Sequence, residues 1–263
     1  MKIFETEAIV LSTRDHGESD RLITFYSREA GKLRGIAKGA RRSQKRFVHT
    51  FESSSLVLMT CRERKSLIWI EACKLLEPYL ELRAEVERWG YAALLSEIFL
   101  EMAPEGEAQE ELFDLLNATL LQLTKNRDPL NVMLLFMVRF LDKMGYLPEL
   151  SHCSVCRSPL RASRRWLWRV KQGDLVCQKH GSIQPSGFPL DVGTLVLMEQ
   201  SRVLSLDRMW RLHLLQEKKA PLFQGLIRVI QDLIRKDLKS LKLLEQIRAA
   251  CSRKSERNRN WSG

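Results

Sequence analysis

"GKLRGIAKGARRSQKRF", residues 31–47, joins a short run typical of a β-strand to a long basic loop. The stretch holds seven Lys and Arg residues and no acidic residue, so its charges repel one another unless something anionic lies against them. Gly35 and Gly39 allow the backbone to bend and to approach a neighbour closely. A solvated loop and a binding surface for a polyanion are the two interpretations.

The surrounding sequence predicts a small β-barrel. Residues 1–75 contain short apolar runs rich in β-forming residues, and turn-forming sequences such as DHGES, REAG and CRERKS separate them. The expected strands are Thr6–Ser12, Arg21–Ser27, Lys32–Lys38, Ser54–Cys61 and Ser66–Cys73. Five short strands with a long loop after the third are the number expected for a Greek-key barrel of the OB type. We therefore predict an OB-type nucleic-acid-binding domain over residues 1–79.

Helical periodicity replaces the strand pattern from Glu77 onward. Residues 80–150 and 185–250 are predicted to form a helical domain, which gives an α+β multidomain chain. Asp128 is a plausible N-cap, with Pro129 at the first helical position. Residues 251–263 have too little apolar content to fold alone and are expected to form a basic flexible tail.

Two paired half-sites stand between the helical blocks, in residues 151–184. Cys153 and Cys156 form a C-x2-C pair, and Cys177 with His180 forms a C-x2-H pair. Two such pairs supply the four tetrahedral ligands of a structural zinc site, so we predict one Zn²⁺ in a zinc-ribbon-like module. RRWLWRV and DLVC, joined by KQGD, are expected to form a hairpin that carries the second pair. His152 competes with His180 for the fourth position.

Composition restricts the class of protein. The longest apolar run, residues 132–138, is far shorter than the ~20 residues that cross a bilayer. No signal peptide is recognised, and six cysteines in 263 residues are too few for a disulfide scaffold, so we expect a cytoplasmic protein with no membrane association. No phosphate-binding loop, nucleophile elbow, H-E-x-x-H or deaminase H-x-E motif is present. DHGESD is interpreted as turn chemistry, with acids that set the geometry of the turn or pair with Arg14 and Arg21. We expect no enzyme activity.

Charge is distributed unevenly along the chain, whose net charge is +11. Residues 1–80 carry 15 basic and 10 acidic side chains, residues 81–150 carry 6 and 13, and residues 151–263 carry 22 and 9. Two basic regions around an acidic middle indicate that the ends meet a polyanion. The candidate phosphate contacts are Arg14, Lys32, Arg34, Lys38, Arg41, Arg42, Lys45 and Arg46. Phe25, Tyr26, Phe47 and Phe51 are candidates for base stacking or for the barrel core.

The N-terminal residues resemble those of the RecO recombination-mediator family. The resemblance rests on a TEA-I-VL opening, then R-x-x-G-E-x-D, then a G-K-L-x-G-x-A-K-G-A-R-R run. The barrel, the helical domain and the cysteine module follow in the order that this family has. The resemblance implies a DNA repair and recombination mediator that binds single- and double-stranded DNA, anneals complementary strands and helps to load recombinase onto DNA coated by single-strand-binding protein.

The same resemblance implies RecR and the acidic C-terminal tail of single-strand-binding protein as partners, and a nucleoid-associated location. An acidic tail with an apolar end needs a hydrophobic groove rimmed by cations. The helical region offers few cations for this purpose: Lys125, Arg127, Arg139 and Lys143. Arg139 is alternatively a cation that reaches solvent or pairs with Asp142.

Two features separate this chain from a simple family member. Zinc-carrying relatives usually offer four cysteines, whereas His180 stands at the fourth place here. Many relatives lack the metal, so zinc is expected to stabilise a small hairpin rather than to take part in the activity. An RNA-binding or transcription-associated adaptor with a zinc ribbon is the alternative function, because both settings use OB barrels and zinc ribbons.

Overall fold

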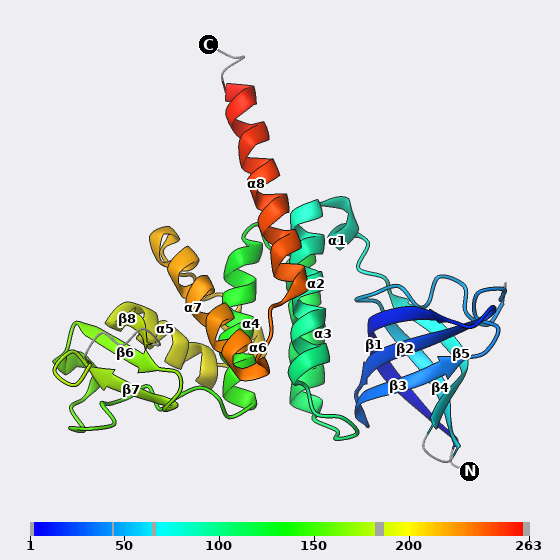
Figure 1. Ribbon diagram of the computed structural model, residues 1–263, viewed down its shortest axis with the longest axis horizontal. Helices are drawn as coiled ribbons and strands as arrows, with labels where there is room; N and C mark the ends of the chain where they lie inside the picture. Colours follow the sequence, from blue (N-terminus) through cyan, green and yellow to red (C-terminus); the bar gives the residue numbers. More distant parts are fainter. Residues whose placement is uncertain (1–2, 44, 65–66, 182–186, 260–263) are drawn as a thin grey trace. The chain divides into compact units, whose positions relative to one another are not determined.

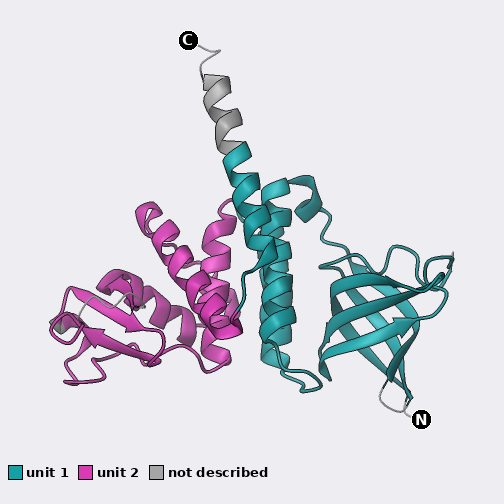
Figure 2. Ribbon diagram, in the orientation of Figure 1, with its two compact units in different colours: residues 1–126, 236–263 teal, residues 127–235 magenta. Residues whose placement is uncertain are grey.

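The computed structural model describes residues 3–43, 45–64, 67–181 and 187–259, with the backbone alone for residue 162 and residues 251–259. The chain forms two compact units (Figure 2). Unit 1 comprises residues 1–126 and 236–263, and unit 2 comprises residues 127–235. Unit 1 therefore contains the barrel together with helices, and unit 2 contains the cysteine module together with the other helices (Figures 1 and 2).

The N-terminal part of unit 1 is a closed five-stranded barrel (Figure 1). Its strands are β1 (Ile3–His16), β2 (Asp20–Ser27), β3 (Gly31–Ala37), β4 (Leu56–Arg64) and β5 (Leu67–Glu77). They follow one another around the barrel in the order β1-β2-β3-β5-β4, with β3 and β5 parallel and the other pairs antiparallel. The predicted OB-type barrel is thereby confirmed. The expected start of the fifth strand, Ser66, lies outside the described residues.

Alternating side chains of these strands build the barrel core. The buried cluster includes Val10, Phe25, Val57 and Met59, with exposed fractions of 0%. Phe47 and Phe51, from the long loop after β3, pack on each other with ring centroids 5.1 Å apart and belong to the same cluster. Tyr26 is also buried and meets Phe99 edge to face at 5.2 Å. All four aromatic candidates are therefore core residues and not stacking surfaces.

Helices α1 (Glu81–Ala84), α2 (Val86–Met102), α3 (Glu110–Lys125) and α8 (Lys239–Arg259) complete unit 1 (Figure 1). Glu97 of α2 accepts hydrogen bonds from the backbone N–H groups of Lys239 and Ser240, at 2.9 and 2.7 Å. It thereby provides acceptors for two N–H groups in the first turn of α8 that have no partner within the helix. Gly90 permits the close packing of α2 on α8, because a Cβ there would lie 2.9 Å from Leu244 Cδ1. The sequence predicts a flexible tail from residue 251, whereas helix α8 continues to Arg259. Residues 260–263 lie outside the described chain.

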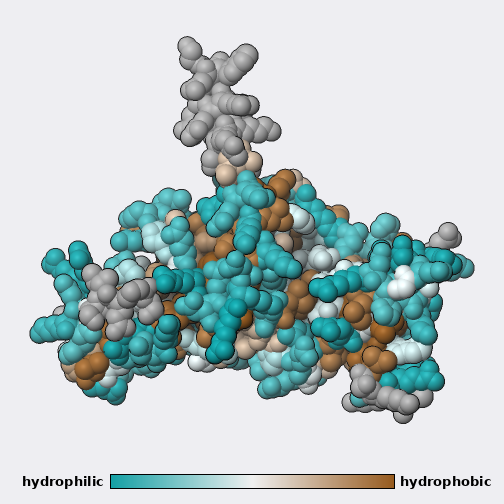
Figure 3. Space-filling view, in the orientation of Figure 1, coloured by the Kyte–Doolittle hydropathy of each residue, from teal (hydrophilic) through white to brown (hydrophobic). Residues whose placement is uncertain are grey.

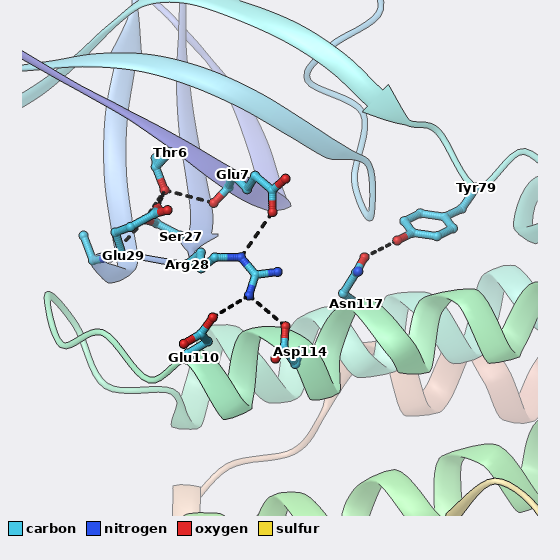
Figure 4. Close-up of polar contacts among 10 residues, drawn as sticks. Thr6, Glu7, Ser27, Arg28, Glu29, Tyr79, Glu110, Asp114 and Asn117 are labelled. Carbon is cyan, nitrogen blue, oxygen red and sulfur yellow. Dashed lines mark hydrogen bonds and ion pairs between the residues drawn. The ribbon is translucent and has the colours of Figure 1, made fainter. Parts of the chain in front are cut away.

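Arg28, after the last residue of β2, joins the barrel to α3 (Figure 4). Its Nε donates to Glu7 at 3.1 Å, and its NH1 donates to Glu110 at 3.1 Å and to Asp114 at 2.9 Å. The guanidinium also lies over the Phe113 ring, 4.3 Å from its centroid. These charge-assisted hydrogen bonds and the stacking hold one side of the barrel on the helix.

Unit 2 contains α4 (Pro129–Lys143), η1 (Leu160–Ala162), β6 (Arg165–Arg169), β7 (Asp174–Cys177), β8 (Gly187–Asp191), α5 (Val192–Val203), α6 (Leu206–Met209) and α7 (Gln216–Ile234). Asp128 caps α4 by accepting from Asn131 N at 3.1 Å, as the sequence predicts. The predicted hairpin is also confirmed, because β6 pairs antiparallel with β7. Strand β8, which the sequence analysis missed, pairs on the other edge of β6. Among the described helices, none has the length and apolar character of a membrane span.

Candidate nucleic-acid interface and candidate metal centre

The basic loop begins beside the turn between β1 and β2. Asp20 Oδ1 accepts hydrogen bonds from Gly39 N and from Ser19 Oγ, each at 2.9 Å, and Arg41 N donates to the Ser19 carbonyl at 3.0 Å. The Gly39 hydrogen bond, followed by that of Ser19, lowers the pKa of Asp20. Gly39 has φ +67°, a backbone conformation that suits glycine. These hydrogen bonds therefore fix the backbone conformation of the first residues after β3.

Acidic residues of the DHGESD turn neutralise part of the basic charge. Asp15 lies 3.6 Å from Arg21 and 3.5 Å from Arg41, measured between carboxylate oxygens and guanidinium Nε atoms. The interpretation of this segment as turn chemistry agrees with these contacts, with Arg21 as one of the two predicted partners. Arg41 is consequently held at the turn.

The other cations of the barrel face differ from Arg41 in having no acidic partner. Arg34 lies on β3, and the remaining residues lie in β1 or in the loop after β3. No carboxylate in the described part of the chain lies within ion-pair distance of any of these exposed residues: Arg14, Arg34, Lys38, Arg42, Lys45 and Arg46. Arg46 donates to a backbone oxygen, the Lys38 carbonyl, at 3.2 Å. Exposed Lys and Arg side chains without an acidic partner are the groups with which OB-fold proteins bind phosphates.

Lys32 does not belong to this surface, although the sequence predicts that it does. Its side chain is buried, with an exposed fraction of 7%, and its Nζ donates to the Leu100 carbonyl at 2.8 Å. Burial lowers the pKa of Lys32. By strand alternation Lys32 shares the outward face of β3 with Arg34, but the end of α2 covers that part of the strand. Lys32 therefore fastens the barrel to α2.

Trp69 on β5 is a feature of this face that the sequence analysis missed. Lys38 Nζ lies 4.3 Å from the centroid of its ring, and the Arg64 guanidinium carbon lies 5.2 Å from the same centroid. Arg64 ends β4, so an aromatic ring and two cations meet across three segments of the chain. The only sequence signal was the alternation of β5, in which Ile68 and Ile70 face the core and Trp69 does not.

The four predicted metal ligands come together in unit 2. Cys153, Cys156, Cys177 and His180 place their ligand atoms within 4.8 Å of one another. Cys156 Sγ lies 3.8 Å from Cys177 Sγ, and His180 Nδ1 lies 3.3 Å from Cys177 Sγ and 3.7 Å from Cys153 Sγ. Tetrahedral zinc with Zn–S of about 2.3 Å and Zn–N of about 2.0 Å separates its ligands by about 3.5–3.8 Å. The donor set therefore fits a tetrahedral metal ion.

Two similar turns present these ligands. The Cys153 carbonyl accepts from Arg157 N at 2.9 Å, and the Cys177 carbonyl accepts from Gly181 N at 3.0 Å, so each pair of ligands lies on a tight backbone loop. Ser154 Oγ donates to Asp174 at 2.6 Å, which links the first loop to the hairpin. Such loops are typical of zinc knuckles in structural sites.

One of the three thiols, that of Cys153, has the lowered pKa expected of a metal ligand. Burial raises the pKa of Cys153, but hydrogen bonds from the backbone N–H groups of Cys156 and Cys177 outweigh this effect and lower the pKa to about 6. Burial, together with the thiols of Cys153 and Cys156, raises the pKa of Cys177. A bound cation would relieve the repulsion between neighbouring thiolates. His152 takes no part, because its Nδ1 lies 2.8 Å from Ser151 Oγ, outside the group of four.

Among the cations proposed for an acidic partner tail, Arg139 is not available on the surface. Arg139 has an exposed fraction of 8%, donates from Nε to the Ser201 carbonyl at 2.7 Å, and also donates to the Leu204 carbonyl. Asp142 pairs with Arg202 at 2.9 Å. Arg139 therefore ties α4 to the C-terminal end of α5, and its assignment to a docking groove loses its structural basis.

The fold and these sites define an OB-barrel protein joined to helices, with a Cys3His group placed to hold a metal ion. The family model described as Recombination protein O N terminal matches residues 1–79, and the model described as Recombination protein O C terminal matches residues 83–242. The chain belongs to the RecO family of DNA repair proteins.

Relatives that carry the family name match nearly the whole chain. DNA repair protein RecO of Syntrophobacter fumaroxidans is 56% identical over 246 residues, which cover 94% of this chain and 98% of the relative. DNA repair protein RecO of Syntrophus aciditrophicus is 33% identical over 92% of this chain and 95% of the relative.

Proposed function

We propose that this protein acts in DNA repair and homologous recombination by binding DNA through its barrel and annealing complementary strands, without catalysing a reaction. The observation that carries the proposal is the set of exposed cations on the barrel that have no acidic partner in the described chain. The family name of the relatives, DNA repair protein RecO, supports DNA as the polyanion.

The chemistry of the surface favours contacts to the DNA backbone over contacts to base edges. Arg and Lys side chains in an exposed loop bind phosphates of any sequence, and the loss of condensed counterions makes such binding depend steeply on salt. In the described chain, these cations lie on strands and in the loop after β3 rather than on a helix that could enter a groove. We expect single- and double-stranded DNA to bind with weak sequence preference, at the nucleoid in the cytoplasm.

The Cys3His group is proposed to hold one Zn²⁺. Three thiolates and an imidazole suit zinc, and four protein ligands leave no open position for substrate. The metal would stabilise a hairpin too small to fold alone, so its contribution would be to folding rather than to DNA binding.

RecR and the acidic tail of single-strand-binding protein remain proposed partners, as does assistance in loading recombinase onto coated DNA. The family membership supports these proposals. Arg139 is engaged with backbone carbonyls, so the tail would bind at a surface that does not depend on this residue.

A strand-annealing assay tests the proposed function. Complementary oligonucleotides, free or coated by single-strand-binding protein, are expected to anneal faster when the protein is present. Arg42→Glu with Lys45→Glu in the basic loop should reduce this acceleration. The control is Arg208→Glu with Arg211→Glu, which changes the same amount of charge at exposed positions of unit 2. No acceleration by the native protein on either substrate would contradict the proposal. Tighter binding to RNA than to single-stranded DNA of equal length, at the same salt, would favour the RNA-binding alternative.

A further inference from the structure

A row of apolar side chains crosses the outer face of the barrel. Leu22 of β2 is the Cα partner of Ile36 of β3, and Ile36 is the partner of Trp69 of β5. The neighbours Ile23, Ala37 and Ile70 face the core, so the members of the row point outward. Leu22, Ile36 and Trp69, which we call the apolar row, are half-buried. Figure 3 shows hydrophobic side chains at the surface of the barrel among hydrophilic ones.

Unpaired cations surround this row. Arg14 is the Cα partner of Leu22 on β1 and extends the row at one end. Arg34 flanks Ile36 on β3, two residues earlier on the same face, and Lys38 and Arg64 lie against the Trp69 ring. In the part of the chain that is described, no carboxylate pairs with any of these four cations. The same face of the barrel can therefore contact apolar groups and bind anions.

Acidic residues limit the surface on one side. Arg14, Leu22 and Arg34 line a groove of about 430 Å³ whose far wall includes Glu101 and Glu105 of unit 1. A phosphate would be repelled by this wall and attracted to the opposite end of the row, where Lys38 and Arg64 stand. The charges therefore favour a path across β2, β3 and β5.

We propose that the apolar row binds unpaired bases of single-stranded DNA, with Trp69 as the stacking platform. The inference rests on the proposed function, since it names the part of the DNA that this face recognises. A single strand presents an apolar base face and an anionic phosphate at every nucleotide, which matches a row of apolar side chains flanked by cations. In a duplex the base faces are stacked on one another, so an aromatic side chain cannot stack on them, whereas the phosphates stay exposed.

The geometry of the sheet suits this role. Adjacent strands lie about 4.8 Å apart, so the row spans about 10 Å from Leu22 to Trp69, enough for a short run of bases. In OB barrels the face of the second and third strands and the loop between the fourth and fifth strands form the oligonucleotide surface. Trp69 is the third residue of β5, the strand that follows that loop. A base that stacks on the ring displaces Lys38 or Arg64, and the displaced cation remains beside the phosphates.

The test compares base-containing and base-free strands. The full chain, as Trp69→Ala, Trp69→Phe and native protein, is titrated with oligo-dT, with an abasic strand of the same length, and with a duplex. We expect Trp69→Ala to weaken oligo-dT binding roughly five-fold to one-hundred-fold, the measured effect of one stacked base, and to leave the abasic strand, the duplex and the salt dependence unchanged. Trp69→Phe should retain most of the affinity.

Tryptophan fluorescence provides a second readout. Oligo-dT should quench the native protein more than Trp69→Phe, because the indole that touches the bases is absent from the variant. Trp89→Phe on α2, where Trp89 has an exposed fraction of 45%, is the matched control and should keep the native quenching. Equal weakening on abasic and base-containing strands, or equal quenching of Trp69→Phe and native protein, would overturn the assignment.

The two proposals fail in different ways. If the native protein binds no DNA, the proposed function and this inference both fail. If it binds oligo-dT and the abasic strand equally and Trp69→Ala behaves as the native protein does, only the role of the apolar row is overturned, and the row is better explained as a contact for a protein partner.

Discussion

Arg28 NH1 donates to Asp114 Oδ1 at 2.9 Å and thereby joins the residue that follows β2 to the N-terminal half of α3 (Figure 4). The pair is part of a larger contact, because the same guanidinium binds Glu7 of the barrel and Glu110 of α3. The side chain of Arg28 keeps an exposed fraction of 26%, so solvent screens these charges only in part. Unit 1 is compact partly because of this one side chain.

Arg28→Ala should lower the free energy of unfolding by about 1–2 kcal/mol, since it removes charge-assisted hydrogen bonds and the stacking on Phe113. Urea unfolding of the full chain measures the effect. Arg42→Ala is the matched control, because Arg42 is exposed and has no acidic partner in the described chain. Equal stability of Arg28→Ala and Arg42→Ala would contradict the structural role.

Charge reversal on the basic loop should weaken DNA binding across all sequences. Arg42→Glu with Lys45→Glu changes two exposed cations without an acidic partner, and leaves the Arg41–Asp15 pair intact. Each lost phosphate contact should reduce the slope of log K against log salt by about one unit. Fluorescence anisotropy at several salt concentrations measures affinity and slope together. A folded double variant with native affinity and native slope would exclude this loop from the interface.

The barrel and the metal ligands could be predicted because their signals are local. Strand alternation and turn residues determine the five strands, and the spacing of the two half-sites determines the ligand group. Lys32 was misassigned because strand alternation shows which face a residue occupies but not whether a distant helix covers that face. Trp69 was missed for a related reason: its cations come from β4 and from the loop after β3, which only the closed barrel brings together.

Arg139→Met should destabilise unit 2 although it replaces a charged side chain by an apolar one of similar length. The native guanidinium binds the Ser201 and Leu204 carbonyls, which would be left without this donor in a buried place. A buried acceptor that loses its partner costs about 1–3 kcal/mol, so the expected loss of stability is about 2–4 kcal/mol. Chemical denaturation measures it, with Lys143→Met on the exposed side of the same helix as the control. Native stability of Arg139→Met would show that these carbonyls find other donors.

The Cys3His group is expected to hold zinc. Freshly purified, reduced protein should contain one zinc per chain, as measured by metal analysis. Cys153→Ser should abolish this content and lower the unfolding midpoint, since the ligand atoms of two backbone loops would no longer share a cation. Chelation of the native protein should have the same effect. The DNA affinity should stay close to native in both cases, because the candidate phosphate contacts belong to unit 1 and the ligands to unit 2.

A pair of histidine variants tests the ligand assignment itself. His180→Ala should lose zinc or bind it far more weakly, whereas His152→Ala should keep full occupancy, because His152 faces Ser151 and not the thiols. Cobalt substitution adds a spectroscopic criterion, since visible absorption reports a tetrahedral site with thiolate ligands. Full occupancy in His180→Ala would show that three thiolates and another ligand suffice. Absence of zinc from the reduced native protein would contradict the proposed metal site. The hairpin would then be stabilised by contacts such as the hydrogen bond of Ser154 with Asp174.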